Sequence, residues 1–473
     1  MNSTTAFEQE FEQNNDSERV VLSEKEHPIL EKDIESEALK VLYRLRDAGY
    51  AGYLVGGGVR DLYLGNKPKD FDISTNARPG QLRKLFRNSR TIGRRFRLVQ
   101  VFFRGNKIIE VSTLRSRSEY DSDEPDKVLP ANNTFGTLEE DAYRRDLTIN
   151  SLFYEIENNT VIDYVGGVQD LTDGIIRIVG EPEQRIIRDP VRILRAIRHA
   201  ARNGFTIEEK TLEAITKHLE KLDLCPTSRI RDELLKDLRG GTSQAWVGLA
   251  LQTGVFATLF PFYQELFQHE TEGEAVKKEL LSLFAALDNI EHNIERVTLE
   301  DAMLFAILLF PWALRRFDLL HQELKGQGYH RLSKAIRADL DQLFARRLNI
   351  KRAIKDKITT LFVNMSSLQK HRTKDTSKDT WPAWLRRKSY FKDCSRFYAL
   401  YQKSISNEQS ADSADIAHFV EDAPKAKRQE KTERPVGAST SGSAADKPQR
   451  GGRRGNNPAF SSDKQGVFGL RTV

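Results

Sequence analysis

The spacing of apolar and polar residues predicts alternating strands and helices over the first third of the chain. Residues 53–55 are a short apolar run of strand formers that ends at three glycines, and residues 59–64 form one helical turn before Gly65. Pro68 bars further helix, so the next strand is expected to begin near Asp70. The same spacing predicts helices at residues 34–48 and 79–87, and strands at residues 97–103 and 107–114.

The rest of the chain is helical in pattern and ends in a polar segment, as it begins with one. Residues 206 to about 400 carry helical periodicity almost throughout. By contrast, residues 1–26 are polar and without period, and residues 405–473 are rich in Ser, Ala, Asp and Lys, with Arg-Gly-Gly at 450–452. We therefore expect both ends to be disordered.

Length and composition indicate a soluble protein with more than one domain. The 473 residues exceed a single ordinary core, and no apolar run approaches the ~20 residues that span a bilayer. The two cysteines, Cys225 and Cys394, lie far apart in the sequence, so we expect neither a disulfide framework nor a zinc site. A reducing cytoplasm fits this cysteine usage.

Positive charge is concentrated near the C-terminus. The net charge is +6, and from residue 425 onward there are eleven Lys and Arg against four Asp and Glu. A cationic segment of this kind either holds nucleic acid through its phosphates or only maintains solubility, and composition does not separate the two.

The paired aspartates Asp70 and Asp72 are the first candidates for chemistry. Residues two apart on a strand share a face, so the two carboxylates would lie side by side and would repel each other unless a cation lay between them. Mg²⁺ prefers oxygen ligands of this kind, and the preceding glycines allow a phosphate to approach backbone N–H groups. Glu110 is either an ordinary exposed residue or a carboxylate that orders this site. Each fragment alone is common on solvated strands, but their combination indicates a metal-held triphosphate.

Two later segments are rich in arginine. Residues 139–152 are interpreted as a helical segment in which Asp146 and Asn150 lie one turn apart on one face, and charge-rich helices are most often solvated. Residues 187–205 predict a basic amphipathic helix with Asp189 as N-cap and Pro190 at its first position, ending at Gly204.

The sequence resembles the class II nucleotidyltransferases of the polymerase-β superfamily, which comprise bacterial poly(A) polymerases and CCA-adding enzymes. The first motif of that family, L-V-G-G-x-V-R-D followed by D-x-D, matches residues 54–61 and 70–72. The second motif, R-R-D-x-T-I-N, matches residues 144–150 without a change, and residues 163–173 match a Gly-hinged turn that joins a catalytic head to a neck.

The resemblance implies roles for individual residues. Asp70 and Asp72 would be catalytic and would hold Mg²⁺, Asp146 would be counted with them as a catalytic carboxylate, and Glu110 would have a supporting role. The residues implied to bind the nucleotide are Gly57, Gly58, Arg60, Asp61, Arg144, Arg145, Asn150, Asp189, Arg192, Arg195 and Arg198.

The helix at residues 187–205 departs from the family pattern at two positions. The nucleobase-recognising motif of the family reads E-D-x-x-R-x-L-R-x-x-R-F-A, and this chain keeps Asp189, Arg192 and Arg195. It has Arg188 where Glu is usual and His199 where Phe is usual, and the first of these changes removes an acidic partner at a position that bears on base selectivity.

The fold implied by the resemblance is α+β. A polymerase-β-like nucleotidyltransferase head with a mixed sheet and helices would be followed by an all-α neck and body and a disordered basic tail. The expected divisions are an N-terminal extension at 1–26, the catalytic head at 27–175, the neck with the nucleotide- and RNA-binding motif at 176–265, the RNA-binding body at 266–404 and the tail at 405–473.

The activity implied is template-independent addition of AMP from ATP to RNA 3′ ends, which promotes RNA turnover in the cytoplasm. Expected partners are the 3′ ends of mRNA, small RNA and decay fragments, together with proteins of the RNA-decay machinery. Residues 92–101 (I-G-R-R-F-R-L-V-Q-V) resemble the poly(A) polymerase signature, apart from Thr91, and favour this activity over CCA addition to tRNA.

Candidate RNA-binding residues come from three basic segments. The segment at 381–401 interleaves cations with aromatic residues, so it would track RNA by charge and stacking or else would be a packed aromatic helix. The candidates are Arg94, Arg95, Arg386, Arg387, Lys388, Arg453 and Arg454. A non-catalytic RNA-binding protein on a decayed head is the third alternative, and the intact aspartates at 70, 72 and 146 argue against it.

Overall fold

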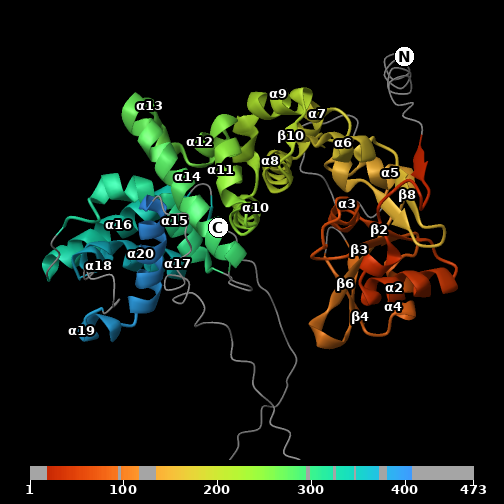
Figure 1. Cartoon of the computed structure of the whole chain (residues 1–473), viewed down its shortest axis with the longest axis horizontal. Coiled ribbons are helices and arrows are strands. Elements are labelled where there is room, and N and C mark those ends of the chain that lie inside the picture. The colour runs from red at the N-terminus through yellow and green to blue at the C-terminus, as the bar shows by residue number, and fades with distance from the viewer. Residues whose placement is uncertain are drawn as a thin grey trace, which may run out of the picture. The chain divides into compact units, whose positions relative to one another are not determined.

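The computed structural model describes residues 19–93, 97–116, 135–293, 299–322, 326–345, 348–371 and 381–406, all of which belong to one compact unit. Within these residues eight strands form one mixed sheet in the order β1-β8-β7-β2-β3-β6-β5-β4 (Figure 1). Neighbouring strands are antiparallel except β3 and β6, which are parallel. The strands are β1 Val20–Leu22, β2 Gly52–Val55, β3 Asp72–Thr75, β4 Ser89–Ile92, β5 Leu98–Phe102, β6 Ile108–Thr113, β7 Phe153–Glu155 and β8 Thr160–Asp163.

β1 lies inside the segment 1–26 that we expected to be disordered. It pairs with β8, with Val20 opposite Asp163 and Leu22 opposite Val161. The prediction of disorder is wrong for this strand, because three consecutive apolar strand formers can pair with an available sheet edge even when their surroundings are polar. Residues 1–18 lie outside the described residues.

α2 and α4 cover one face of the sheet, and the opposite face carries polar groups next to a smaller apolar cluster that includes Val55 and Phe153. α2 contacts β2, β3 and β6, while α4 contacts β4 and β5. Leu42 of α2 packs in the same buried cluster as Ile73 and Val111, and strand residues alternate between faces, so Asp72 and Glu110 point to the opposite face. The helices associated with the sheet are η1 Glu31–Asp33, α2 Ser36–Asp47, α3 Gly57–Tyr63, α4 Pro79–Leu85, η2 Arg104–Asn106, α5 Leu138–Tyr143, η4 Thr148–Asn150 and α6 Gly167–Asp173.

The sequence pattern located most of these elements, and three expectations need correction. The strand expected near Asp70 begins at Asp72, so the two aspartates do not share one strand. The helical segment expected at 139–152 ends at Tyr143, because the following backbone pairs with residues 177–179 instead; the amide of Val179 donates to the carbonyl of Asp146 at 3.1 Å. The helix expected to have Asp189 as N-cap and Pro190 as its first residue begins one residue later, at Val191, with Pro190 as N-cap, and residues 187–188 belong to the preceding helix α7 (Pro182–Arg188).

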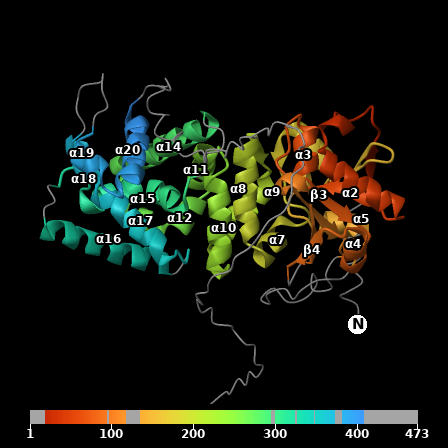
Figure 2. The same ribbon diagram turned by 90° about the horizontal axis from the view of Figure 1, so that it is seen from below.

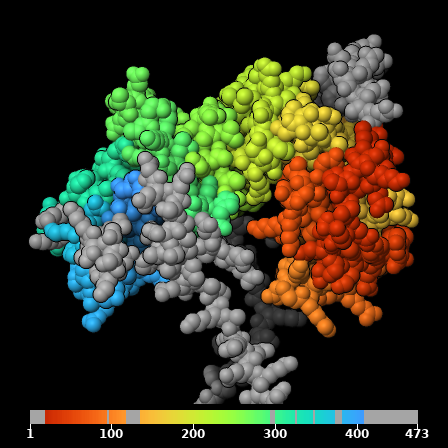
Figure 3. All heavy atoms as spheres, viewed as in Figure 1, coloured from red at the N-terminus to blue at the C-terminus, as the bar shows by residue number. Residues whose placement is uncertain are grey.

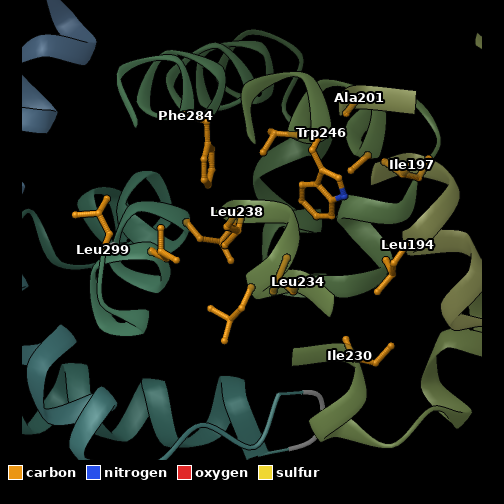
Figure 4. Packing of buried hydrophobic residues seen from close by; sticks show 14 of the residues in the cluster. Leu194, Ile197, Ala201, Ile230, Leu234, Leu238, Trp246, Phe284 and Leu299 are labelled. Atoms are coloured by element: carbon orange, nitrogen blue, oxygen red, sulfur yellow. The ribbon is translucent and has the colours of Figure 1, made fainter. Parts of the chain in front are cut away.

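A helical region follows the sheet and buries a core of its own (Figure 4). Leu194, Ile197 and Ala201 of α8 and Ile230, Leu234 and Leu238 of α10 recur at helical spacing and face Trp246 of α11, which is 1% exposed. The space-filling view shows the yellow-green atoms of this region in continuous contact (Figure 3). Its elements are α7 Pro182–Arg188, α8 Val191–Asn203, α9 Glu209–Lys217, η5 Leu219–Leu224, α10 Thr227–Leu238, α11 Ser243–Gln252, α12 Val255–Leu259, η6 Pro261–Tyr263 and α13 Gln264–Gln268, with the two-residue strands β9 Ile175–Ile176 and β10 Thr206–Ile207.

The remaining described helices pack around α15. This helix is buried along nearly its whole length, and its Phe310 meets the rings of Phe362, Phe397 and Tyr401 at 4.9–5.9 Å. α16 and α17 lie side by side (Figure 2). None of the helices in the described ranges has both the length and the apolar character that crossing a membrane requires. The bounds are α14 Glu270–Asn293, α15 Asp301–Phe317, α16 Gln327–Ala345, α17 Arg352–Val363, α18 Met365–His371, α19 Ala383–Arg386 and α20 Phe391–Ile405.

A glycine substitution tests how tightly the end of the sheet region is packed. A Cβ at Gly167 of α6 would lie 2.3 Å from the backbone oxygen of Thr148 in η4, so Gly167→Ala should cost about 1–3 kcal/mol and lower the urea midpoint. Gly80→Ala is the matched control, since nothing lies within 4 Å of its added Cβ and alanine favours helix. Equal midpoints for Gly167→Ala and the wild type would contradict this packing.

Candidate active site

Two carboxylates lie beside each other because β3 and β6 pair in parallel. The register sets Asp72 opposite Glu110, and the next pair on that face, Ser74 and Ser112, is joined by a hydrogen bond of 3.1 Å between the hydroxyl oxygens. Gln100 on β5 donates its side-chain amide to Glu110 at 2.9 Å. Backbone pairing therefore fixes where both carboxylates lie, before any ligand is bound.

The surroundings of Asp72 disfavour its negative charge. Its pKa is raised to about 6, first because protein atoms displace water from the carboxyl and next because Glu110 is negative; Asp70 adds to this and Arg145 opposes it. The side chain is still accessible to solvent. A ligand can therefore reach the Asp72 carboxyl from solvent, although many protein atoms surround it and raise its pKa.

This donor set fits a hard divalent cation. Asp70, Asp72 and Glu110 offer oxygen ligands, and a cation would stabilise the charge of Asp72, whose pKa is raised by burial and by the two neighbouring carboxylates. In the part of the chain that the structure describes, no three His, Cys, Asp or Glu side chains are already gathered closely enough to hold a metal by themselves. A metal at this position would therefore need further oxygen ligands, which the phosphates of a nucleotide can supply.

Asp146 lies in a different environment from the other predicted catalytic carboxylates. It is buried, and its Oδ2 forms an ion pair with Nε of Arg195 at 2.7 Å. Burial alone would raise its pKa, but the charges of Arg195 and then Arg192 outweigh this and hold the pKa at about 2. The structure thus brings Glu110, rather than Asp146, beside Asp72. The catalytic role of Asp146 stays a prediction that rests on the family motif.

The glycine turn after β2 passes between two guanidinium groups. Gly56 has φ 69° and ψ −139°, a conformation that residues with a side chain rarely adopt. A Cβ on Gly56 would lie 3.7 Å from Nη1 of Arg145, and a Cβ on Gly57 would lie 3.4 Å from Nη2 of Arg60. A phosphate that approached this turn, as expected from the sequence, would therefore lie near the positive charges of Arg145 and Arg60.

Arg60 joins the sheet region to the neck. Its side chain is only 3% exposed; Nη1 donates to Oδ1 of Asn150 at 2.7 Å and lies 3.2 Å from Nδ1 of His199, while Nε and Nη2 donate to Asp61 at 2.9 and 2.6 Å. We expected Arg60, Asp61 and Asn150 to contact the nucleotide. In the structure their polar groups bond one another, because a buried guanidinium must have its donors satisfied, and their contact with the nucleotide stays a prediction.

His199 contributes a polar group to this joint where the family motif has Phe. Nε2 of its ring lies 3.3 Å from the amide nitrogen of Asn150, so both ring nitrogens face donors. Burial and then the charge of Arg60 hold the pKa of His199 well below its usual value, against the attraction of Asp146. The imidazole is therefore neutral and can accept from one of the two donors.

Asp141 holds both arginines of the R-R-D motif, and the sequence analysis missed it. This fully buried residue of α5 pairs with Nη2 of Arg144 at 2.6 Å and with Nη2 of Arg145 at 2.9 Å. Arg145 also lies over the ring of Phe153, 5.0 Å from its centroid, and its Nη2 donates to the hydroxyl of Ser74 at 3.4 Å. The spacing of three and four residues from Asp141 was a usable signal for these pairs.

The predicted base-recognition residues on the neck have protein partners. Asp189 is the C-cap of α7 rather than an N-cap, and its two carboxylate oxygens accept from Arg229 at 2.6 and 2.8 Å. Nη1 of Arg192 donates to the backbone oxygen of Arg145 at 3.3 Å. The α8 arginines are thus anchored on the segment that carries the R-R-D motif.

Arg198 was expected among the nucleotide-binding residues, and the structure places it in the neck. Its Nη2 lies 2.5 Å from Glu233 of α10, and its Nε forms an ion pair with the buried Asp237. Both partners lie on α10, so Arg198 joins α8 to α10 within the neck. A nucleotide contact by Arg198 stays a prediction that rests on the family motif.

The RNA-binding candidates fall into two groups. Arg386, at the end of α19, and the following Arg387 and Lys388 are exposed, and the neighbouring Trp384 is 49% exposed. The other four candidates, Arg94, Arg95, Arg453 and Arg454, lie outside the described residues.

Comparisons with known proteins agree with the sequence motifs. Residues 52–177 match the family model of the poly A polymerase head domain, and residues 204–267 match the model described as the probable RNA and SrmB-binding site of polymerase A. Poly(A) polymerase I of Salmonella typhi is 42% identical over 370 residues, which cover 76% of this chain and 77% of that protein.

CCA-adding enzymes are also similar to this chain. The enzyme of Lactobacillus helveticus is 37% identical over 256 residues, which cover 54% of this chain and 60% of that protein. A crystal structure of the Bacillus stearothermophilus CCA-adding enzyme in complex with CTP aligns with a TM-score of 0.57 at 23% identity, covering 79% of this chain and 80% of that chain. At this identity the alignment shows the fold alone, and it confirms the expected α+β head followed by helices. From the extent and identity of its match to poly(A) polymerase I, the chain belongs to the bacterial poly(A) polymerase family of nucleotidyltransferases.

Proposed function

We propose that this chain adds AMP from ATP to RNA 3′ ends without a template. The observation that carries the proposal is the Asp72–Glu110 pair beside Arg145 and the glycine turn. Negative oxygens that can hold a cation thus lie next to a guanidinium that can hold phosphates. The identity of 42% to poly(A) polymerase I of Salmonella typhi supports this reaction and substrate.

Asp70 and Asp72 would hold Mg²⁺, with Glu110 in support. When bound, the metal lowers the pKa of the RNA 3′-OH and stabilises the charge of the triphosphate and of the departing pyrophosphate. Arg145 would bind triphosphate oxygens, and Arg144 would add a second positive charge. Asp189, Arg192 and Arg195 on the neck would position the base and sugar, as their motif implies.

The RNA would be held by the helical regions. The match of residues 204–267 to an RNA-binding family model supports this for the neck, and the exposed cations Arg386, Arg387 and Lys388 next to Trp384 support it for the body. Cys225 and Cys394 are both free thiols, which fits a cytoplasmic location. We also propose that the RNA extended by this chain is passed to proteins of the RNA-decay machinery.

The choice of nucleotide and primer separates this function from CCA addition. With Mg²⁺ and one NTP at a time, we expect a long ladder with ATP alone on a generic labelled RNA, and weaker use of CTP, GTP and UTP. A tRNA lacking its 3′ end serves as the second primer. Stepwise addition of C, C and A that is confined to this tRNA would show a CCA-adding enzyme instead.

Substitution of the carboxylates tests their assignment. Asp72→Asn should lower the rate of AMP transfer by roughly 1,000-fold, because a neutral amide holds a divalent cation poorly, while RNA binding in a gel shift stays unchanged. Glu110→Gln should reduce the rate less. Asp47→Asn, at an exposed residue of α2, is the matched control and should keep full activity. Polymerisation by Asp72→Asn at the wild-type rate would remove Asp72 from the site.

Charge removal tests the RNA surface on the body. Replacing Arg386, Arg387 and Lys388 together by Ala should weaken binding of single-stranded RNA and reduce the slope of log K against log salt by about 2. The control is a triple Ala variant of Lys32, Lys40 and Arg46, which removes the same charge near α2. If both variants weaken RNA binding equally, the effect reflects net charge rather than this surface.

A further inference from the structure

Asp141 is the buried centre of an arginine cluster next to the carboxylates. Its side chain is fully buried, and each of its oxygens has donors. Oδ1 accepts from Nε of Arg144 at 2.7 Å and from the backbone amide of Arg115 at 3.2 Å. Oδ2 accepts from Nε and Nη2 of Arg145 at 3.2 and 2.9 Å. The carboxylate of Asp141 therefore holds two guanidinium groups and the backbone of Arg115, just after the end of β6.

The cluster brings several cations together. Arg115, Arg144 and Arg145 are close enough to influence one another, and Asp141 acts on all three. Burial and then the charge of Arg144 lower the pKa of Arg115 to about 10. The neighbouring guanidinium groups of Arg144 and Arg145 suit a ligand with several negative charges, such as a triphosphate.

Asp141 also decides which carboxylate Arg145 pairs with. Arg145 acts electrostatically on Asp72, but its guanidinium forms an ion pair with Asp141. It also contacts Ser74, the backbone oxygen of Asn150 and the face of Phe153. A guanidinium released from Asp141 would be free to pair with Asp72, on which its charge already acts. Such pairing would neutralise the oxygens that a cation needs.

We propose that Asp141 is a positioning residue for nucleotidyl transfer, which orients Arg144 and Arg145 toward the triphosphate and keeps Arg145 from pairing with Asp72. This inference rests on the proposed function in one respect, namely that the nucleotide is the ligand of the two arginines. Asp141 itself touches neither substrate nor metal. Its effect on the reaction passes through Arg145 and, to a lesser extent, through Arg144.

A purely structural buried ion pair offers the matched control. Asp170 of α6 is 4% exposed, accepts from Arg177 at 3.0–3.3 Å and from Thr148 at 2.6 Å, and belongs to the same sheet region. Asp170→Asn and Asp141→Asn each remove one charge from a buried carboxylate–arginine pair, so both should lower the melting temperature. Arg177 is not among the charges that raise or lower the pKa of Asp72.

The test compares wild type, Asp141→Asn and Asp170→Asn in three measurements. We expect Asp141→Asn to weaken ATP binding in EDTA about tenfold or more and to raise the KM for ATP by a similar factor. It should also raise the Mg²⁺ concentration for half-maximal activity several-fold, since Arg145 then competes for Asp72. Asp170→Asn should change none of these beyond twofold. Equal ATP binding and Mg²⁺ dependence in the two variants would overturn the proposal.

Two further variants keep the test decisive. If Asp141→Asn does not fold, the double variant Asp141→Asn/Arg144→Gln restores the charge balance and should show the same raised Mg²⁺ requirement. In a double-mutant cycle, Asp141→Asn should add little to the loss of ATP binding caused by Arg145→Gln, and full additivity would contradict action through Arg145. Failure of the wild type to use ATP would refute the proposed function, whereas an active wild type with indifferent variants would refute only this inference.

Discussion

The repulsion between two carboxylates on neighbouring parallel strands is the constraint on which the rest of the site depends. Parallel pairing of β3 with β6 leaves Asp72 no position other than beside Glu110, and the pKa of Asp72 is raised first by burial and next by this repulsion. The same sheet face therefore needs positive charge close by. Arg145 supplies part of it from the segment after α5, and Asp141 limits how much of it reaches Asp72. The carboxylates of Asp72 and Glu110 are thus only partly neutralised by Arg145, and a divalent cation can supply further positive charge.

The segment from Arg144 to Asn150 also connects the sheet to the neck. Asp146 pairs with Arg195 of α8, the backbone oxygen of Arg145 accepts from Arg185 and Arg192, and Asn150 meets Arg60 and His199. The motif residues of the neck are thereby tied to the same few residues that face the carboxylates. A short stretch of chain sets the distance between the groups proposed for phosphate and metal and those proposed for the base.

The sequence alone predicted the strand before the glycine turn and the helical character after residue 206, because period and turn chemistry are local properties. It did not predict that Asp146 would face the neck, since that depends on backbone pairing with residues 177–179 that lie far away in the sequence. The contacts of Arg60 and His199 could not be predicted for the same reason. Arg60 bonds Asn150, 90 residues later in the sequence, and contacts His199, 139 residues later. Asp141 was within reach of sequence reasoning through its spacing to Arg144 and Arg145. It was overlooked because a charged residue on a charge-rich helix is most often solvated, and this one is buried.

Binding of a divalent cation to the carboxylate pair tests the central claim most directly. Mn²⁺ can stand in for Mg²⁺ and be followed by electron paramagnetic resonance during titration of the protein with a non-reactive ATP analogue. The account predicts tight Mn²⁺ binding that requires the analogue and is lost in Asp72→Asn, because the protein oxygens alone do not complete the site. Equal Mn²⁺ affinity in the wild type and Asp72→Asn would show that the cation binds elsewhere, and the assignment of this sheet face as the active site would be wrong.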